Sequence, residues 1–135
     1  MDRDPASILD IVLACRRLRR FVAGRTREDL DRDDLFLYAV LPATALIGEA
    51  ASRLSPEFRQ DHPEIPWGDI IGTRNRIIHG SDTVKTDMIW DTAAAKAELL
   101  LERLVPLLPP EPVAPTDAPR ESQTDPTESA LADSR

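Results

Sequence analysis

Arg74 and His79 are the residues of this chain best suited to chemistry, and they lie five positions apart just before Gly80. An arginine guanidinium is planar, permanently charged and able to hold a phosphate through two parallel hydrogen bonds, while a histidine can take or give a proton near neutral pH. Cleavage of RNA needs both abilities, because the attacking 2′-hydroxyl loses a proton, the phosphorus centre gains charge and the leaving oxygen takes a proton. The two side chains could supply these roles without a metal ion.

The hexapeptide that contains the pair also has ordinary structural interpretations. Arg74 could be a solvated helix arginine near Asp69, and His79 could sit in a last helical turn, where the dipole favours a cation. Asn75 could orient a ribose hydroxyl or the imidazole, since an amide both donates and accepts, or it could be helix surface. Short motifs of this length often match by chance, so the choice between a catalytic and a structural interpretation depends on the sequence around the hexapeptide.

Five further motifs surround the hexapeptide. They are Ile47-Gly48-Glu49-Ala50, Leu54-Ser55-Pro56-Glu57, Pro63-Glu64-Ile65-Pro66-Trp67, Ile70-Ile71-Gly72 and Ile89-Trp90. In this order and spacing, from about residue 6 to about residue 105, the chain resembles the HepT-like branch of the HEPN superfamily. Arg74, Asn75 and His79 fall on the RNxxxH core of that family.

The resemblance implies a small all-helical homodimer that cleaves RNA without a metal ion or other cofactor. Proteins of this kind act as toxins, in type VII-like pairs with a minimal (MntA-like) nucleotidyltransferase antitoxin. By the resemblance, Arg74, Asn75 and His79 are each candidate catalytic residues.

Ser81 departs from the family pattern, which continues as RNxxxHxY and whose tyrosine is the hydroxyl that the partner enzyme modifies with AMP. A serine hydroxyl is shorter and much less acidic than a phenol. Three explanations follow: Ser81 is modified instead, silencing works by binding alone, or the pairing has been lost. Ser81 is also explained simply as a turn residue beside Gly80 and Asp82.

Composition divides the chain into a folded domain, residues 1–108, and a tail, residues 109–135. The tail holds six prolines and few large apolar residues, which predicts disorder. It also carries six acids against two arginines, so it accounts for -4 of the net charge of -7. A mildly acidic domain is not typical of a general nucleic-acid binder, which usually shows a basic stripe.

Basic residues nevertheless cluster in one stretch, at Arg16, Arg17, Arg19, Arg20, Arg25 and Arg27. We favour the solvated face of a helix as their explanation over an RNA track, because charge runs commonly just solvate. Cys15 is the only cysteine, which excludes an intrachain disulfide and a thiolate zinc site. We find no apolar stretch as long as a membrane span and no signal peptide, and we expect a cytoplasmic protein.

Apolar periodicity predicts an all-α fold, an antiparallel four-helix bundle. We expect helices over residues 6–23, 35–54, 66–79 and 86–105, with no strand pattern. Thr26 with Asp29 should cap a short turn, Pro42 should kink the second helix and Thr86 should cap the fourth. Gly48 either allows another helix to approach closely or is simply tolerated.

Helix geometry constrains the mechanism, because five residues turn a regular helix by roughly 140°. Arg74 and His79 therefore converge on one phosphate only if the helix ends at Gly80 so that His79 bends out of line, or if a two-fold partner supplies its own copies. We expect a homodimer with a shared groove. The alternative function is a non-catalytic dimeric protein that binds a nucleotidyltransferase or a nucleotide.

Overall fold

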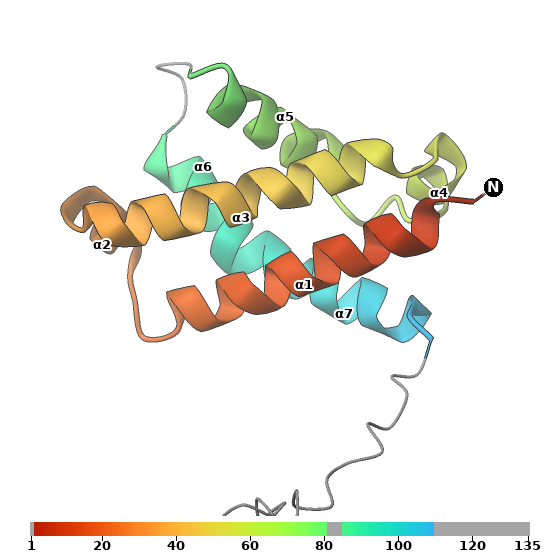
Figure 1. Cartoon of the computed structure of the whole chain (residues 1–135), viewed down its shortest axis with the longest axis horizontal. Helices are drawn as coiled ribbons and strands as arrows, with labels where there is room; N and C mark the ends of the chain where they lie inside the picture. Colours follow the sequence, from red (N-terminus) through yellow and green to blue (C-terminus); the bar gives the residue numbers. More distant parts are fainter. Residues whose placement is uncertain (1, 81–84, 110–135) are drawn as a thin grey trace, which may run out of the picture.

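The computed structural model describes residues 2–80 and 85–109, and it is all-α, with no strand in those two ranges (Figure 1). The helical elements are α1 (Asp4–Val22), α2 (Arg27–Arg32), α3 (Asp34–Arg53), α4 (Pro56–Asp61), α5 (Trp67–Ile78), α6 (Thr86–Trp90), the π-helix η1 (Asp91–Lys96), α7 (Ala97–Leu104) and the 3₁₀ turn η2 (Val105–Leu107). Ser81 and all but the first residue of the tail lie outside the described residues.

The two longest helices, α1 and α3, run antiparallel and side by side (Figure 1). Helix α5 packs on α3, and the continuous segment from α6 to α7 crosses behind α1 and α3. The core fills the space between them. Its fully buried large side chains are Ile11, Leu18, Leu30, Ile47, Leu54, Ile70, Leu100 and Leu104. The predicted all-α class is confirmed.

Polar caps set the boundaries of the N-terminal helices. Thr26 and Asp29 form the predicted capping box at α2, and the carboxylate of Asp33 accepts a hydrogen bond from the backbone N–H of Phe36 at 3.2 Å to start α3. Helix α3 then continues through Pro42 without interruption. The exposed position of this proline places the lost hydrogen bond on the solvent side, where water can replace it.

Helix α3 has the length and apolar composition of a membrane span, so our expectation that no stretch reaches that length was wrong. Its place in the fold explains the composition, because it packs against both α1 and α5 and contributes core residues to each contact. A helix that is apolar on more than one side is typical of the centre of a helical domain as well as of a membrane.

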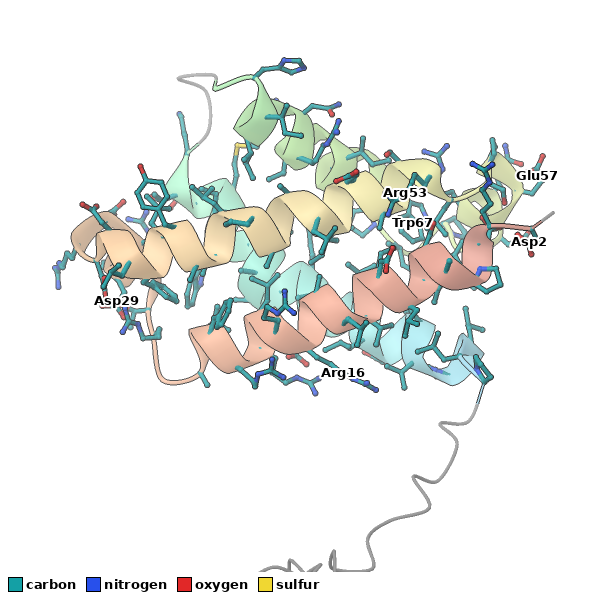
Figure 2. The ribbon with its side chains drawn as sticks, viewed as in Figure 1. Asp2, Arg16, Asp29, Arg53, Glu57 and Trp67 are labelled. Carbon is teal, nitrogen blue, oxygen red and sulfur yellow. The ribbon has the colours of Figure 1, made fainter. Side chains whose placement is uncertain are left out.

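The short helix α4 is anchored to the start of α1. The carboxylate of Asp4 accepts from the backbone N–H and the hydroxyl of Ser55, at 2.8 and 2.7 Å, while the Ser55 hydroxyl caps α4 by accepting from Phe58 N–H. Trp67 then opens α5, buried, with its indole donating to the His62 carbonyl at 3.0 Å. Figure 2 shows Trp67 at the end of the molecule where α1 begins.

The fourth predicted helix is one continuous segment with a π-helical insert, η1, between α6 and α7. Its predicted cap was wrong: Lys85 is the N-cap, and the Thr86 hydroxyl instead accepts from Arg27 Nη1 at 3.0 Å. Arg27 also pairs with Asp87 at 2.7 Å, so it fastens α6 to α2. Arg27, one of the arginines of the basic stretch, therefore has a structural role.

Candidate functional site

Gly48 in α3 positions Arg74 in α5. A Cβ atom built at Gly48 would overlap the Cβ of Arg74 and lie 2.9 Å from the carbonyl oxygen of Ile70, so the two helices meet where one residue lacks a side chain. Of the two explanations open for Gly48, the close helix approach is the one that the structure supports. The arginine is therefore held against α3 at its base, and only its far end is free to reach a ligand.

The guanidinium of Arg74 is half-buried and turned toward its neighbour. Its Nη1 donates to Asn75 Oδ1 at 3.0 Å, while its Nε is buried and has no hydrogen-bond partner among residues 2–80 and 85–109. A buried donor of this kind is costly unless a ligand or water completes it. Arg74 is thus partly buried, and Asn75 lies where an amide can orient the guanidinium.

His79 stands just past the end of α5. The helix ends at Ile78, and His79 is its C-cap, with its backbone N–H donating to the Asn75 carbonyl at 3.0 Å. Gly80 follows with φ +57°, the left-handed conformation that commonly terminates helices. The imidazole is exposed, and no side chain of the described residues contacts it through a hydrogen bond. The helix thus ends one residue earlier than we predicted, and the convergence of His79 with Arg74 stays a prediction.

The structure therefore brings Arg74 and Asn75 into contact and places His79 one helical turn further along, at the open end of α5. It supplies no direct contact between the guanidinium and the imidazole. Ser81 lies outside the described residues. The described residues contain no group of three or more His, Cys, Asp or Glu side chains that could hold a metal ion.

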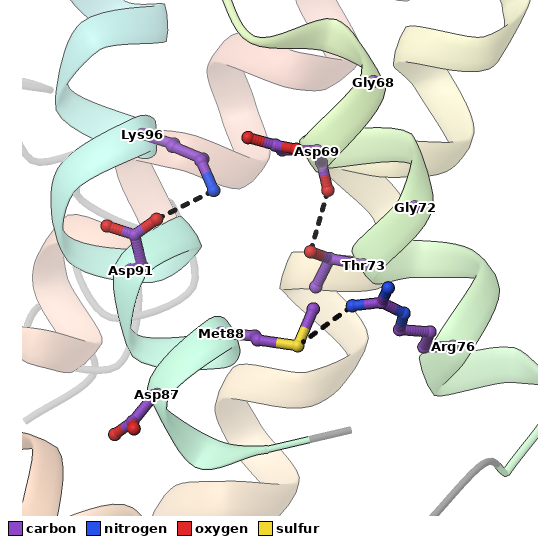
Figure 3. Close-up of a pocket in the computed structure, with 9 residues that line it drawn as sticks. All are labelled: Gly68, Asp69, Gly72, Thr73, Arg76, Asp87, Met88, Asp91 and Lys96. Carbon is purple, nitrogen blue, oxygen red and sulfur yellow. Dashed lines mark hydrogen bonds and ion pairs between the residues drawn. The ribbon is translucent and has the colours of Figure 1, made fainter. Parts of the chain in front are cut away.

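A cavity of about 360 Å³ opens on the neighbouring face of α5, toward α6 and η1 (Figure 3). Its walls include two glycines and an arginine from α5, and charged side chains from the opposite segment. The lining residues are Gly68, Asp69, Gly72, Thr73, Arg76, Asp87, Met88, Asp91 and Lys96. Sequence reasoning missed this cavity, although Gly68 and Gly72, one helical turn apart, are the signal that could have indicated a bare face.

Several arginines of the basic stretch form ion pairs within the domain. Arg25 pairs with Asp33 at 2.6 Å, and Arg19 makes two hydrogen bonds to Glu98 of α7, at 2.7 and 2.6 Å. Figure 2 shows Arg16 on the side of α1 away from α3. Arg19 and Arg25 therefore have structural roles, and the solvated helix face that we favoured for this stretch over an RNA track stays a prediction.

Two pKa shifts follow from these contacts. The hydrogen bonds from Arg19 lower the pKa of the Glu98 carboxyl and raise that of the arginine itself. Burial raises the pKa of the Cys15 thiol to about 12, with the nearby Glu98 charge adding to the effect and Arg19 opposing it. Cys15 is fully buried in α1, so it packs as a small apolar residue.

Residues 11–105 match the family model described as Ribonuclease HepT-like, a range that begins within α1 and ends just after α7. The chain belongs to the HepT-like ribonuclease family. The match includes Arg74, Asn75 and His79 as well as every helix that holds them in place. It also confirms the resemblance that the separated sequence motifs indicated.

Relatives of this HepT-like chain carry names of the same kind. It is 34% identical over 91 residues to a candidate RNase of Caldanaerobacter subterraneus subsp. tengcongensis, which covers 67% of this chain and 81% of the relative. It is 32% identical over 83 residues to a Thermococcus cleftensis protein named "Probable ribonuclease HepT", covering 62% and 76%. Comparison with solved structures gave no match.

Proposed function

We propose that this HepT-like chain is a metal-independent endoribonuclease in which Arg74 and His79 act on the same phosphodiester. The observation that carries the proposal is the position of Arg74, fixed at its base by Gly48 and with a buried Nε that lacks a partner, one turn before an exposed histidine at a helix end. Membership of a ribonuclease family supports the same activity.

In this mechanism, one imidazole removes the proton from the ribose 2′-hydroxyl as its oxygen attacks phosphorus, and an acid returns a proton to the departing 5′-oxygen. The products are a 2′,3′-cyclic phosphate and a free 5′-hydroxyl. Arg74 stabilises the negative charge on the non-bridging oxygens, and Asn75 orients the guanidinium through the 3.0 Å hydrogen bond. No step in this sequence requires a metal ion.

A second copy of the chain completes the proposed site. General base and general acid are two roles, and each protomer offers one histidine in this region, His79. Ile78 beside it is 53% exposed, and Leu35 and Tyr38 of α3 are 84% and 71% exposed. Large apolar side chains in such positions are commonly covered by a partner. A two-fold dimer would bring both imidazoles to one groove.

Within this proposal the protein is a cytoplasmic toxin, silenced by a nucleotidyltransferase antitoxin. Family membership supports this role, and the serine at position 81 distinguishes the chain from the usual modified tyrosine. Incubation with ATP and a neighbouring nucleotidyltransferase, followed by intact mass measurement, tests the switch. Addition of an AMP mass to wild type but not to Ser81→Ala assigns the site, and an unchanged mass with inhibition retained indicates silencing by binding.

Cleavage of labelled tRNA and mRNA in the presence of a chelator tests the activity. We expect products from wild type that are lost in Arg74→Ala and His79→Ala and retained in two matched controls, His62→Ala and Arg103→Ala. His62 lies beside Trp67 at the opposite end of α5 from His79, and Arg103 belongs to α7. Products that persist in both site variants, or that need a divalent ion, contradict the proposal. No product from any form, including wild type, supports the non-catalytic binder.

Sedimentation at micromolar concentration tests the shared groove. We expect a dimer for wild type and a monomer with little cleavage for Ile78→Glu, because a charge at an exposed apolar position opposes burial in an interface. A monomeric wild type that cleaves RNA at full rate would rule out a groove shared between subunits.

A further inference from the structure

The cavity beside α5 has a flat stretch of helix backbone within one wall and a charged wall opposite (Figure 3). Gly68 and Gly72 form the flat stretch, and a Cβ atom built at either glycine meets nothing within 4 Å. Open space over bare helix backbone suits a planar ring. The volume of about 360 Å³ lies within the range of about 300–1,000 Å³ found for small-molecule sites.

The π-helical insert forms the charged wall. Asp91 and Lys96 are five residues apart and pair at 2.8 Å, with the lysine side chain only 16% exposed. Five residues of a regular α-helix would turn these two side chains roughly 140° apart, whereas a π turn places residue i+5 above residue i. The insert therefore directs a largely buried ammonium group into the cavity, and such inserts occur frequently at functional sites.

Asp69 faces this lysine from α5 (Figure 3). The other two carboxylates of the cavity have cations, since Asp87 pairs with Arg27 and Asp91 with Lys96. Within residues 2–80 and 85–109, no cation lies within ion-pair distance of the Asp69 carboxylate. Its oxygens are thus available to accept hydrogen bonds, while the ammonium of Lys96 has donors beyond the one given to Asp91.

We propose that the cavity is a base-binding subsite that takes guanine from the RNA substrate. Guanine presents two adjacent N–H donors, at N1 and N2, for a carboxylate such as Asp69, and beside them the O6 acceptor for an ammonium such as Lys96. Adenine presents an amino donor toward the lysine and a bare N1 toward the carboxylate. Both adenine contacts are therefore unfavourable, so the pair of groups selects guanine over adenine.

The order of residues along α5 places this base next to the reaction. Arg76 lies two turns beyond Asp69, about 10.5 Å along the axis, a span that a single nucleotide can bridge. Among residues 2–80 and 85–109, its Nη1 donates only to the weak acceptor Met88 Sδ, at 3.2 Å, so the guanidinium can exchange that contact for a phosphate. His79 follows one turn later at the helix end. A guanine in the cavity thus directs the adjoining phosphate toward His79.

This subsite rests on the proposed nuclease function for its biological role, but its test does not need catalysis. Calorimetric titration of the full-length protein with GMP, IMP and AMP measures base selection directly. We expect GMP to bind at least tenfold more tightly than AMP, with IMP between them because it lacks the N2 amino group. The same order should hold for His79→Ala.

Three variants locate the site. Asp69→Asn should remove the GMP preference, Gly72→Leu should fill the cavity and abolish binding, and Asp61→Asn, an exposed acid of α4, should change neither. Because leucine is a better helix former than glycine, Gly72→Leu is expected to fold, which its melting temperature verifies. Equal affinity for GMP and AMP, no binding at millimolar GMP, or normal binding by a folded Gly72→Leu each overturns the subsite.

Mapping of cleavage products separates the two proposals. Selective GMP binding without any RNA cleavage keeps the subsite and removes the nuclease. Cleavage through Arg74 and His79 at positions unrelated to guanine, with no mononucleotide selectivity, keeps the nuclease and removes the subsite. Cuts adjacent to guanine that become indiscriminate in Asp69→Asn support both.

Discussion

Gly48 of α3 lies directly against the Cβ of Arg74 in α5, at a point where no other residue type fits without movement. The contact joins a helix of the core to the residue that carries the proposed phosphate-binding charge. Arg74 also contributes a half-buried guanidinium whose Nε has no partner. A single contact, between Gly48 and Arg74, therefore both packs α3 against α5 and positions the guanidinium.

Replacement of Gly48 by alanine should damage both stability and activity. The added methyl overlaps the Arg74 Cβ, and overpacking of this kind costs about 1–3 kcal/mol in the free energy of unfolding. If α5 shifts by roughly 1 Å in response, cleavage should fall on the order of a hundredfold. Urea titration and a labelled-RNA assay measure the two effects.

Gly72→Ala is the matched control, because a Cβ atom there meets open space. Alanine in a helix interior should instead raise the free energy of unfolding by about 1 kcal/mol. If both alanine variants change stability in the same direction and by the same amount, the close approach at Gly48 is not what fixes Arg74.

Sequence alone predicted the helices and the RNxxxH residues but not how these residues are supported. The positions of α1, α3, α5 and α7 follow from apolar periodicity and capping residues, which are local signals. The contact of Gly48 with Arg74 is not local, and a glycine within an apolar helix has two equally ordinary explanations until its neighbour is known. A helix end at Gly80 that bends His79 out of line was one of two geometric options that the sequence left open, and the helix ends one residue earlier, at Ile78.

Cys15 should resist alkylation in the folded protein. Burial raises its pKa to about 12, so near pH 8.5, the ordinary pKa of a thiol, it stays protonated and out of reach of reagent. Intact mass after iodoacetamide treatment should show no addition in buffer and one addition in urea. Leu13→Cys, whose side-chain position on α1 is 49% exposed, should take one label in buffer. A label on native wild type would show that α1 opens readily.

Acid should weaken the contact between α1 and α7. Arg19 lowers the folded-state pKa of Glu98, so this carboxylate contributes stability that is complete above its ordinary value of 4.5 and is lost as pH falls through the lowered value. Glu98→Gln should therefore flatten the fall in unfolding free energy between pH 7 and pH 3. The pair is half-exposed, so the effect should be smaller than that of Gly48→Ala.

The exposed acid Glu102, on the same helix, provides the control for this measurement. Glu102→Gln should leave the pH profile close to that of wild type, because no cation of the described residues pairs with it. If the two glutamine variants have the same profile, the contact between Arg19 and Glu98 does not contribute to acid stability.

The π-helical insert was beyond sequence prediction for a physical reason. Four of its six residues are Thr92, Ala93, Ala94 and Ala95, and small side chains give a weak periodic signal, so one extra residue in the turn leaves the apolar pattern of the whole segment looking α-helical. The cavity that the insert borders was missed along with it. The charged wall of this cavity depends on the π-helical backbone of η1, which amino-acid composition does not predict.

Deletion of Ala95, an exposed residue of the insert, should convert η1 into a regular α-helix. An insert of this kind holds one residue more than an α-turn, so its removal keeps α6 and α7 in register with the core, and Asp91 and Lys96 become an i, i+4 pair. We expect a folded protein whose melting temperature is equal to or above that of wild type.

Deletion of Ala39 from the regular helix α3 should instead rotate half of that helix by 100° and unfold the domain. If the Ala95 deletion unfolds the domain as the Ala39 deletion does, the insert is required for α7 to pack against the core and is not a local feature of the cavity wall.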